Sequence, residues 1–171
     1  MVKWIHIADV HLGASPDAGD AYSKVRPQEL WDTFAEVIDI CEREQTDLLL
    51  IAGDLFHRQP LKKELKEVDY YFSRLSRTKV VLIAGNHDFL KKDSYYRSFQ
   101  WSSNVYPLFD KEPECVIFED IDVAVTGFSY ESREILTPFD GGIRAEGDAK
   151  YEILLVHGGD EKHLPIQKSL L

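Results

Sequence analysis

Residues that bind metal ions or transfer protons recur at four places in this sequence, each directly after a short apolar run. In an open α/β sheet the carboxyl ends of the strands share one edge, where ligands bind, so we expect these side chains to lie close together. They are Asp9, His11, Asp54, His57, Asn86, His87 and His157. Glycines accompany them and would allow sharp turns and close approach of a phosphate: Gly53, Gly85, Gly158 and Gly159.

The types and spacing of these residues suit the binding of two metal ions. Asp9 and His11 are two residues apart, so on a strand their side chains share a face and can bind one ion together. Asp54 has two carboxylate oxygens and can bridge two ions, while Asn86 offers an amide oxygen and His157 a second imidazole. A mixed set without thiolates favours Mn²⁺, Fe or Zn²⁺ over Ca²⁺. Taken singly, each pair also fits an ordinary strand-end turn.

Composition and charge exclude several classes of protein. The 171 residues are 44% hydrophobic and 29% charged, which excludes dominant disorder and fits one domain over residues 1–171. No apolar run reaches the roughly 18 residues of a membrane span, and we expect no membrane partner. A formal net charge of −10 argues against binding nucleic acid by side-chain charge alone, so divalent metal would have to supply positive charge. Cys41 and Cys115 do not make a disulfide framework, and we expect a reduced, cytoplasmic setting.

The elements that must position these residues are short strands and two helices. Several of the apolar runs lack polar alternation, which predicts strands buried on both faces; the runs span residues 2–8, 47–52, 79–84, 116–118, 121–126 and 152–156. The runs 116–118 and 121–126 are predicted to form a hairpin. Apolar residues at helical spacing predict helices around 30–41 and 61–75, with Pro27 in the first turn of one and Pro60 before the other. Residues 13–23 and 138–149 are predicted loops.

This order of elements predicts an α/β fold. Strand, helix, strand, helix, strand implies right-handed crossovers and a largely parallel sheet, and the later hairpin makes the sheet arrangement mixed. We therefore expect a mixed β-sheet sandwich flanked by helices.

The motifs resemble those of a known family. Asp9-x-His11, Gly53-Asp54 and Gly85-Asn86-His87-Asp88 are similar to the first three blocks of the calcineurin-like metallophosphoesterase superfamily. The longer strings IADVHLG, IAGDLFHRQP, IAGNHD and LLVHGGDEKHLP resemble the SbcD-type DNA repair nucleases, which work with an SbcC-type ATPase. The resemblance covers almost the whole chain and implies an αββα sandwich.

The resemblance also implies roles for individual residues. Asp9 and His11 would hold the first metal, Asn86 and His157 the second, and Asp54 both. Two catalytic histidines complete the implied set: His87 would face the scissile phosphate and assist the leaving oxygen, and His57 would position the phosphate.

One block of the family pattern does not occur in this sequence. The family's Gly-His-x-His supplies one more imidazole to each metal, and the only histidine after His157 is His163, in different surroundings. We therefore interpret the chain as the N-terminal portion of a longer nuclease. We expect it to be weak or inactive alone, unless self-association covers the incomplete second sheet.

Several other residues have a structural and a functional interpretation. His6 is predicted to be a buried core histidine, His163 a loop or DNA-side residue, and Asp88 a residue that orients the neighbouring loop or His87. Lys62, Lys63 and Lys66 are expected on a solvated helix face. The aromatic cluster from Tyr95 to Trp101 could stack nucleic-acid bases, but packing in the core is favoured.

The sequence thus predicts a metal-dependent phosphodiesterase or exonuclease that acts on DNA ends in repair and is homodimeric as the whole protein. It would use two divalent metal ions, with Mn²⁺ favoured and Fe or Zn²⁺ as alternatives. Two other functions remain open. One is a phosphoesterase that acts on small nucleotides or phosphoproteins. The other is a non-catalytic platform that binds an ATPase partner.

Overall fold

The computed structural model describes residues 1–15, 19–139, 143, 149–159 and 162–166. Its elements alternate strand and helix in the first half of the chain and are mostly strands in the second. They are β1 (Trp4–Ile7), α1 (Asp20–Glu44), β2 (Leu48–Ala52), α2 (Lys62–Ser73), β3 (Lys79–Ile83), the short 3₁₀ helix η1 (Tyr95–Ser98), β4 (Val105–Pro107), β5 (Glu114–Phe118), β6 (Val123–Gly127) and β7 (Tyr151–Leu155).

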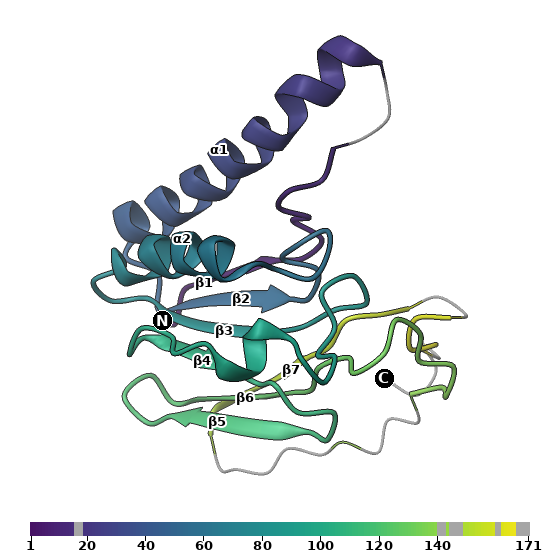
Figure 1. Ribbon diagram of the computed structural model, residues 1–171. Coiled ribbons are helices and arrows are strands. Elements are labelled where there is room, and N and C mark those ends of the chain that lie inside the picture. The colour runs from purple at the N-terminus through teal and green to yellow at the C-terminus, as the bar shows by residue number, and fades with distance from the viewer. Residues whose placement is uncertain (16–18, 140–142, 144–148, 160–161, 167–171) are drawn as a thin grey trace.

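The first sheet is parallel throughout, with the order β1-β2-β3-β4. Both long helices cover one face of it (Figure 1). Leu49 and Ile51 of β2 point to that face and pack with Phe34 and Ile38 of α1 and Phe72 of α2. Because every β2 residue is buried, this strand lies between two apolar layers, as its uninterrupted apolar run predicts.

The second sheet, β5-β6-β7, lies against the other face of the first (Figure 1). Leu48 and Leu50 of β2 share an apolar cluster with Phe118 of β5 and with Val123 and Val125 of β6. β5 and β6 form the predicted antiparallel hairpin, whereas β6 and β7 are parallel. The predicted mixed α/β sandwich flanked by helices is confirmed.

The structure corrects three details. α1 begins at Asp20, so Pro27 lies inside the helix, and the predicted loop 13–23 is helical from residue 20 onward. The first part of α1 projects beyond the sheets (Figure 1). Because it has little core to pack against, its sequence lacks the regular apolar spacing that predicts a helix. β4 was not predicted, because three residues ending in Pro107 give no strand periodicity. Residues 16–18 and most of the predicted loop 138–149 lie outside the described residues.

The aromatic cluster belongs mainly to the core. Tyr96 is buried against Phe56 and Phe109, and Trp101 packs on Phe72 and Phe99. Only Tyr95 is well exposed, with the ammonium of Lys62 over its ring. The base-stacking alternative is therefore not supported for the buried members.

The lysines of α2, the two cysteines and the helix lengths bear on the remaining predictions. Lys62, Lys63 and Lys66 are exposed, as expected of a solvated helix face. Cys41 and Cys115 are both free thiols. Within the described part of the chain, no helix combines the length and apolar character needed to cross a membrane.

Candidate metal centre

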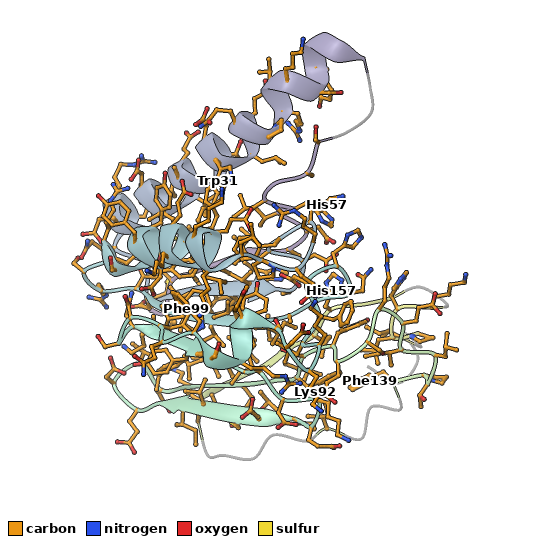
Figure 2. The ribbon with its side chains drawn as sticks, in the orientation of Figure 1. Trp31, His57, Lys92, Phe99, Phe139 and His157 are labelled. Atoms are coloured by element: carbon orange, nitrogen blue, oxygen red, sulfur yellow. The ribbon has the colours of Figure 1, made fainter. Side chains whose placement is uncertain are left out.

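The predicted site residues meet at the carboxyl edge of the first sheet. The segment after β1 is tied to the segment after β2, because the His11 amide donates to the Asp54 carbonyl at 3.0 Å and the Leu12 amide to the Leu55 carbonyl at 2.9 Å. β7 ends at the same edge, so His157 joins residues far away in the sequence. Figure 2 shows His57 and His157 on this one side of the molecule.

Asp54 is at the centre of the site. Its side chain is only 2% exposed, and its two oxygens face different histidines. Oδ2 lies 3.8 Å from Nε2 of His11, and Oδ1 lies 3.7 Å from Nε2 of His157. The His87 amide donates to Oδ1 at 2.9 Å and fixes the orientation of the carboxylate. A buried carboxylate in this position can contribute one oxygen to each of two cations.

Asp9 completes the group around His11. Its Oδ1 lies 3.7 Å from His11 Nε2, and ligand atoms of Asp9, His11 and Asp54 all lie within 4.8 Å of one another. Asp9 is 61% exposed, so this side of the site is open to solvent. Burial lowers the pKa of His11, against the opposing effect of Asp54, and this favours the neutral imidazole that can ligate a cation.

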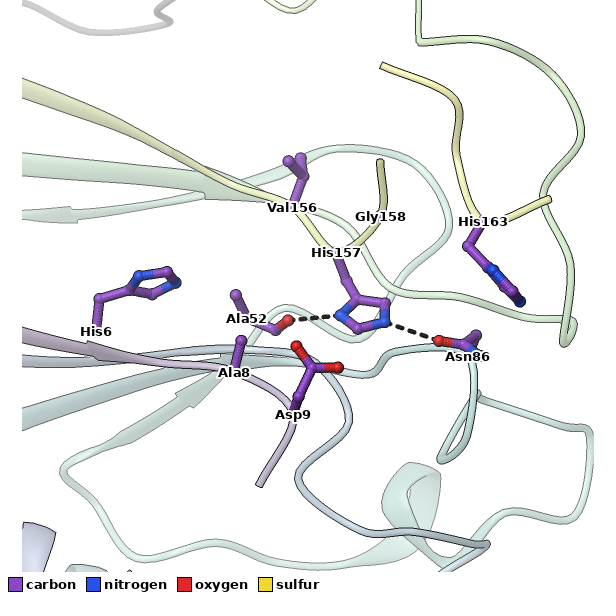
Figure 3. Close-up of a pocket in the computed structure, with 9 residues that line it drawn as sticks. All are labelled: His6, Ala8, Asp9, Ala52, Asn86, Val156, His157, Gly158 and His163. Atoms are coloured by element: carbon purple, nitrogen blue, oxygen red, sulfur yellow. Dashed lines mark hydrogen bonds between the residues drawn. The ribbon is translucent and has the colours of Figure 1, made fainter. Parts of the chain in front are cut away.

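His157 and Asn86 form the other half of the site (Figure 3). His157 Nδ1 lies 2.8 Å from the Ala52 carbonyl, and Nε2 lies 2.8 Å from Asn86 Oδ1. A carbonyl only accepts, so Nδ1 donates to Ala52 and a neutral His157 carries a lone pair on Nε2. Two lone-pair atoms, Nε2 and Oδ1, then face each other. A cation that binds both relieves this opposition.

His57 and His87 lie beside His11. The ring centroids of His57 and His87 are 5.0 Å apart, and the His11 ring lies 4.8 Å from that of His87. His87 Nδ1 is 3.0 Å from the His57 carbonyl, an acceptor, which leaves His87 Nε2 free to face the site. His57 itself is exposed and His87 partly buried.

Three of the six non-glycine residues with positive φ in the described part of the chain belong to the site. Asp9, His11 and Asp54 have φ values of 53°, 51° and 51°, in the left-handed region that side chains other than glycine rarely adopt. Such strain costs on the order of 1 kcal/mol or more per residue and tends to cluster at functional sites.

Two glycines make room for the site. A Cβ on Gly53 would meet the His157 ring at 2.7 Å, and a Cβ on Gly85 would collide with Asp54. These glycines were predicted to let a phosphate approach. The structure shows that they admit side chains of the site itself.

Asp88 organises the loop behind the site, as predicted. It accepts hydrogen bonds from the amides of Gly85 and Phe56 and from the hydroxyl of Tyr96. Asp88 is fully buried, and this burial raises its pKa to about 6.

A pocket of about 350 Å³ opens next to Asp9, Asn86 and His157. His6 lines it and is exposed, so the prediction of a buried core histidine is wrong. β1 is at the edge of the sheet, and its burial alternates, so His6 faces the pocket (Figure 3). His163 also lines the pocket, brought there by the turn in which the Gly159 amide bonds its carbonyl.

Tyr130 supports the site from behind and was not found from the sequence. It is fully buried, and its hydroxyl donates to the His157 carbonyl at 2.9 Å. No motif marks this tyrosine, which follows β6 and meets the end of β7 only in the folded chain.

The donor set fits divalent cations. Asp9, His11 and Asp54 supply carboxylate and imidazole ligands on one side, and Asn86 and His157 supply amide and imidazole ligands on the other. Adjacent ligands about 2.1 Å from an octahedral ion lie about 3.0 Å apart, close to the separation of His157 Nε2 and Asn86 Oδ1.

Comparisons with known proteins found relatives of this chain. Over 96% of this chain, it is 34% identical to the uncharacterized metallophosphoesterase YhaO of Bacillus subtilis, covering 43% of that protein. It is 28% identical over 99% of its length to the DNA double-strand break repair protein Mre11 of Saccharolobus solfataricus, covering 44% of it. The crystal structure of Pseudomonas putida nuclease MPE aligns with a TM-score of 0.41 and 19% identity, covering 86% of this chain and 58% of that one.

The chain spans less than half the length of these curated relatives. The family profile described as calcineurin-like phosphoesterase matches residues 2–169, which is nearly the whole chain. The resemblance inferred from the motifs is therefore confirmed, and the chain belongs to the calcineurin-like phosphoesterase family.

Proposed function

We propose that this chain carries out metal-dependent hydrolysis of phosphodiester bonds at DNA ends, as the nuclease part of an SbcD-type repair enzyme. The observation that carries the proposal is the buried carboxylate of Asp54, whose two oxygens face His11 and His157 at 3.8 and 3.7 Å. A relative named as a DNA double-strand break repair protein supports DNA as the substrate class.

The ligand atoms divide into two sets that share Asp54. Asp9 and His11, whose side chains approach each other, would hold the first cation, and the facing atoms of Asn86 and His157 would hold the second. We assign Mn²⁺ rather than Fe or Zn²⁺, because carboxylate and amide oxygens outnumber the imidazoles. When bound, two such cations polarise the phosphoryl oxygens and stabilise an in-line displacement.

His87 and His57 act on the substrate rather than on the cations. The His57 carbonyl holds His87 Nδ1, so Nε2 of a protonated His87 can donate to the departing oxygen. His57 is exposed beside it and can hydrogen-bond a phosphate oxygen.

The proposed location, partner and oligomeric state follow from the resemblance to SbcD-type nucleases. The chain works in the cytoplasm with an SbcC-type ATPase, and the whole protein is a homodimer. The net charge of −10 makes DNA binding by this chain alone weak, so the cations and partners supply the attraction to phosphate. With three protein ligands at each cation, we expect the isolated chain to turn over slowly.

The test is hydrolysis by the purified 171-residue chain. Bis-p-nitrophenyl phosphate is incubated with Mn²⁺ at high protein concentration, and end-labelled linear duplex DNA is compared with small nucleotides. We expect Mn²⁺-dependent turnover of the diester, release of nucleotides from DNA ends, and loss of both in the His87→Gln variant.

Lys66→Ala is a matched control, because this lysine is exposed on α2 and should leave turnover unchanged. Hydrolysis of small nucleotides without DNA would overturn DNA as the substrate. Tight ATPase binding without any hydrolysis would overturn the enzymatic proposal and favour the platform alternative.

A further inference from the structure

Three histidine side chains from three neighbouring strand ends form one contiguous cluster. The ring centroids of His11, His57 and His87 are 5.4, 4.8 and 5.0 Å apart in pairs. One ring nitrogen from each residue lies within 4.8 Å of the other two. The cluster shares His11 with the Asp9 and Asp54 group but otherwise consists of different residues.

Hydrogen bonds connect the three chain segments that contain these histidines. The His11 amide donates to the Asp54 carbonyl at 3.0 Å, and the His57 amide donates to the Leu12 carbonyl at 3.1 Å. His87 Nδ1 lies 3.0 Å from the His57 carbonyl. Histidines that ligate metals usually donate their second ring N–H to such an acceptor, because the bond orients the ring and leaves the other nitrogen unprotonated.

The donor set selects a particular class of cation. Three imidazoles with no carboxylate form the ligand set of a zinc site that leaves a fourth position open. Imidazole suits Zn²⁺, whereas carboxylate and amide oxygens suit Mn²⁺. We propose that His11, His57 and His87 form a separate Zn²⁺ site whose occupation excludes the cation held by Asp9, His11 and Asp54.

The three ring nitrogens need to move only slightly closer together to bind one ion. Nitrogens bound to one Zn²⁺ at 2.0–2.1 Å in a tetrahedral arrangement lie about 3.4 Å apart, whereas the nitrogens of this cluster lie within 4.8 Å of one another. His57 is exposed, so its ring can move toward the other two without disturbing the core.

The exclusion follows from the chemistry of His11. A neutral imidazole carries a lone pair on one nitrogen and a proton on the other, so His11 ligates one cation at a time. Its Nδ1 is buried without a hydrogen-bond partner in the described part of the chain, so no acceptor locks the proton there. Zn²⁺ at this site would occupy both His11 and His87 and would therefore inhibit hydrolysis. This inhibition rests on the proposed function.

The experiment measures binding and requires no turnover. Co²⁺ is titrated into the metal-free 171-residue chain as a spectroscopic substitute, because four-coordinate Co²⁺ absorbs visible light strongly. Zn²⁺ is then titrated by calorimetry with and without Mn²⁺. We expect one intense Co²⁺ spectrum that Zn²⁺ abolishes, and weaker apparent Zn²⁺ binding as Mn²⁺ increases.

Two reciprocal variants separate the sites. His57→Ala should weaken Zn²⁺ binding at least tenfold and keep Mn²⁺ binding, whereas Asp9→Asn should weaken Mn²⁺ binding and keep Zn²⁺ binding. Both side chains are exposed, so the fold should be unaffected, which circular dichroism checks. Unchanged Zn²⁺ affinity in His57→Ala, or independent binding of Zn²⁺ and Mn²⁺, would overturn the proposal. Absence of hydrolysis would affect only the proposed function.

Discussion

His157 Nε2 lies 2.8 Å from Asn86 Oδ1, although 71 positions separate the two residues. Because the Ala52 carbonyl engages His157 Nδ1, a neutral His157 turns a lone pair toward the Asn86 oxygen. This pairing is unfavourable without a cation or proton between the two atoms. A cation bound between these two atoms would relieve the opposition.

Asn86→Ala should remove the second cation and leave the first. The amide oxygen is lost, while Asp9, His11 and Asp54 remain in place. Calorimetric titration with Mn²⁺ should report one ion where the parent chain binds two. The matched control is Asn104→Ala, because the Asn104 amide bonds the carbonyls of Phe72 and Thr78 away from the site and should not affect stoichiometry. Two ions in Asn86→Ala would contradict the assignment.

Gly85→Ala should weaken both cations together. A Cβ at this position would lie 2.6 Å from the Asp54 amide nitrogen and collide with its carboxylate, so Asp54 must move. We expect a loss of about 1–3 kcal/mol in the free energy of unfolding and at least tenfold weaker Mn²⁺ binding. Urea unfolding and Mn²⁺ titration measure the two effects.

Gly19→Ala serves as the control for that variant, since a Cβ there meets nothing within 4 Å. It should cost some stability at φ 95° but leave Mn²⁺ affinity unchanged. Normal Mn²⁺ affinity in Gly85→Ala would show that Mn²⁺ binding does not require the present position of the Asp54 carboxylate.

His87→Gln should separate chemistry from metal binding. Glutamine cannot deliver a proton as an imidazolium does, so turnover of bis-p-nitrophenyl phosphate should fall about 10²–10⁴-fold. Mn²⁺ affinity should stay within about twofold, because His87 is not in either proposed Mn²⁺ ligand set. A parallel loss of Mn²⁺ binding would instead make His87 a ligand.

Asp88 should give stability an unusual pH dependence. Its pKa rises from 3.8 in the unfolded chain to about 6 in the folded protein, because the carboxyl group is fully buried. The folded state therefore binds more protons between these values, and this contribution is full below pH 3.8 and is lost as pH rises through 6. The slope is at most about 1.4 kcal/mol per pH unit.

The measurement compares the parent chain with Asp88→Asn by urea unfolding in EDTA, from pH 4.5 to 7. Because asparagine does not titrate, the stability difference between the two proteins should shrink as pH rises. A difference that stays constant over this range would show that Asp88 keeps one charge state.

Much of the fold was predictable because the central strands β2, β3 and β6 are buried on both faces. Runs such as residues 47–52 and 79–84 lack polar alternation, and the helical stripes between them imply parallel crossovers. β4 and the start of α1 escaped prediction, since a three-residue strand and a largely solvated helix end have no distinct apolar pattern. His6 was misassigned because edge-strand exposure depends on what pairs with β1.

The sequence by itself determined the ligand types and the strand ends that carry them, since local spacing places Asp9-x-His11, Asp54 and Asn86 after apolar runs. Only the tertiary structure decided which atoms meet. The sandwich brings β7 beside the first sheet, so His157 reaches Asn86 and Asp54, and the absence of side chains at Gly53 and Gly85 makes that approach possible. Such contacts depend on packing between sheets, which no local pattern encodes.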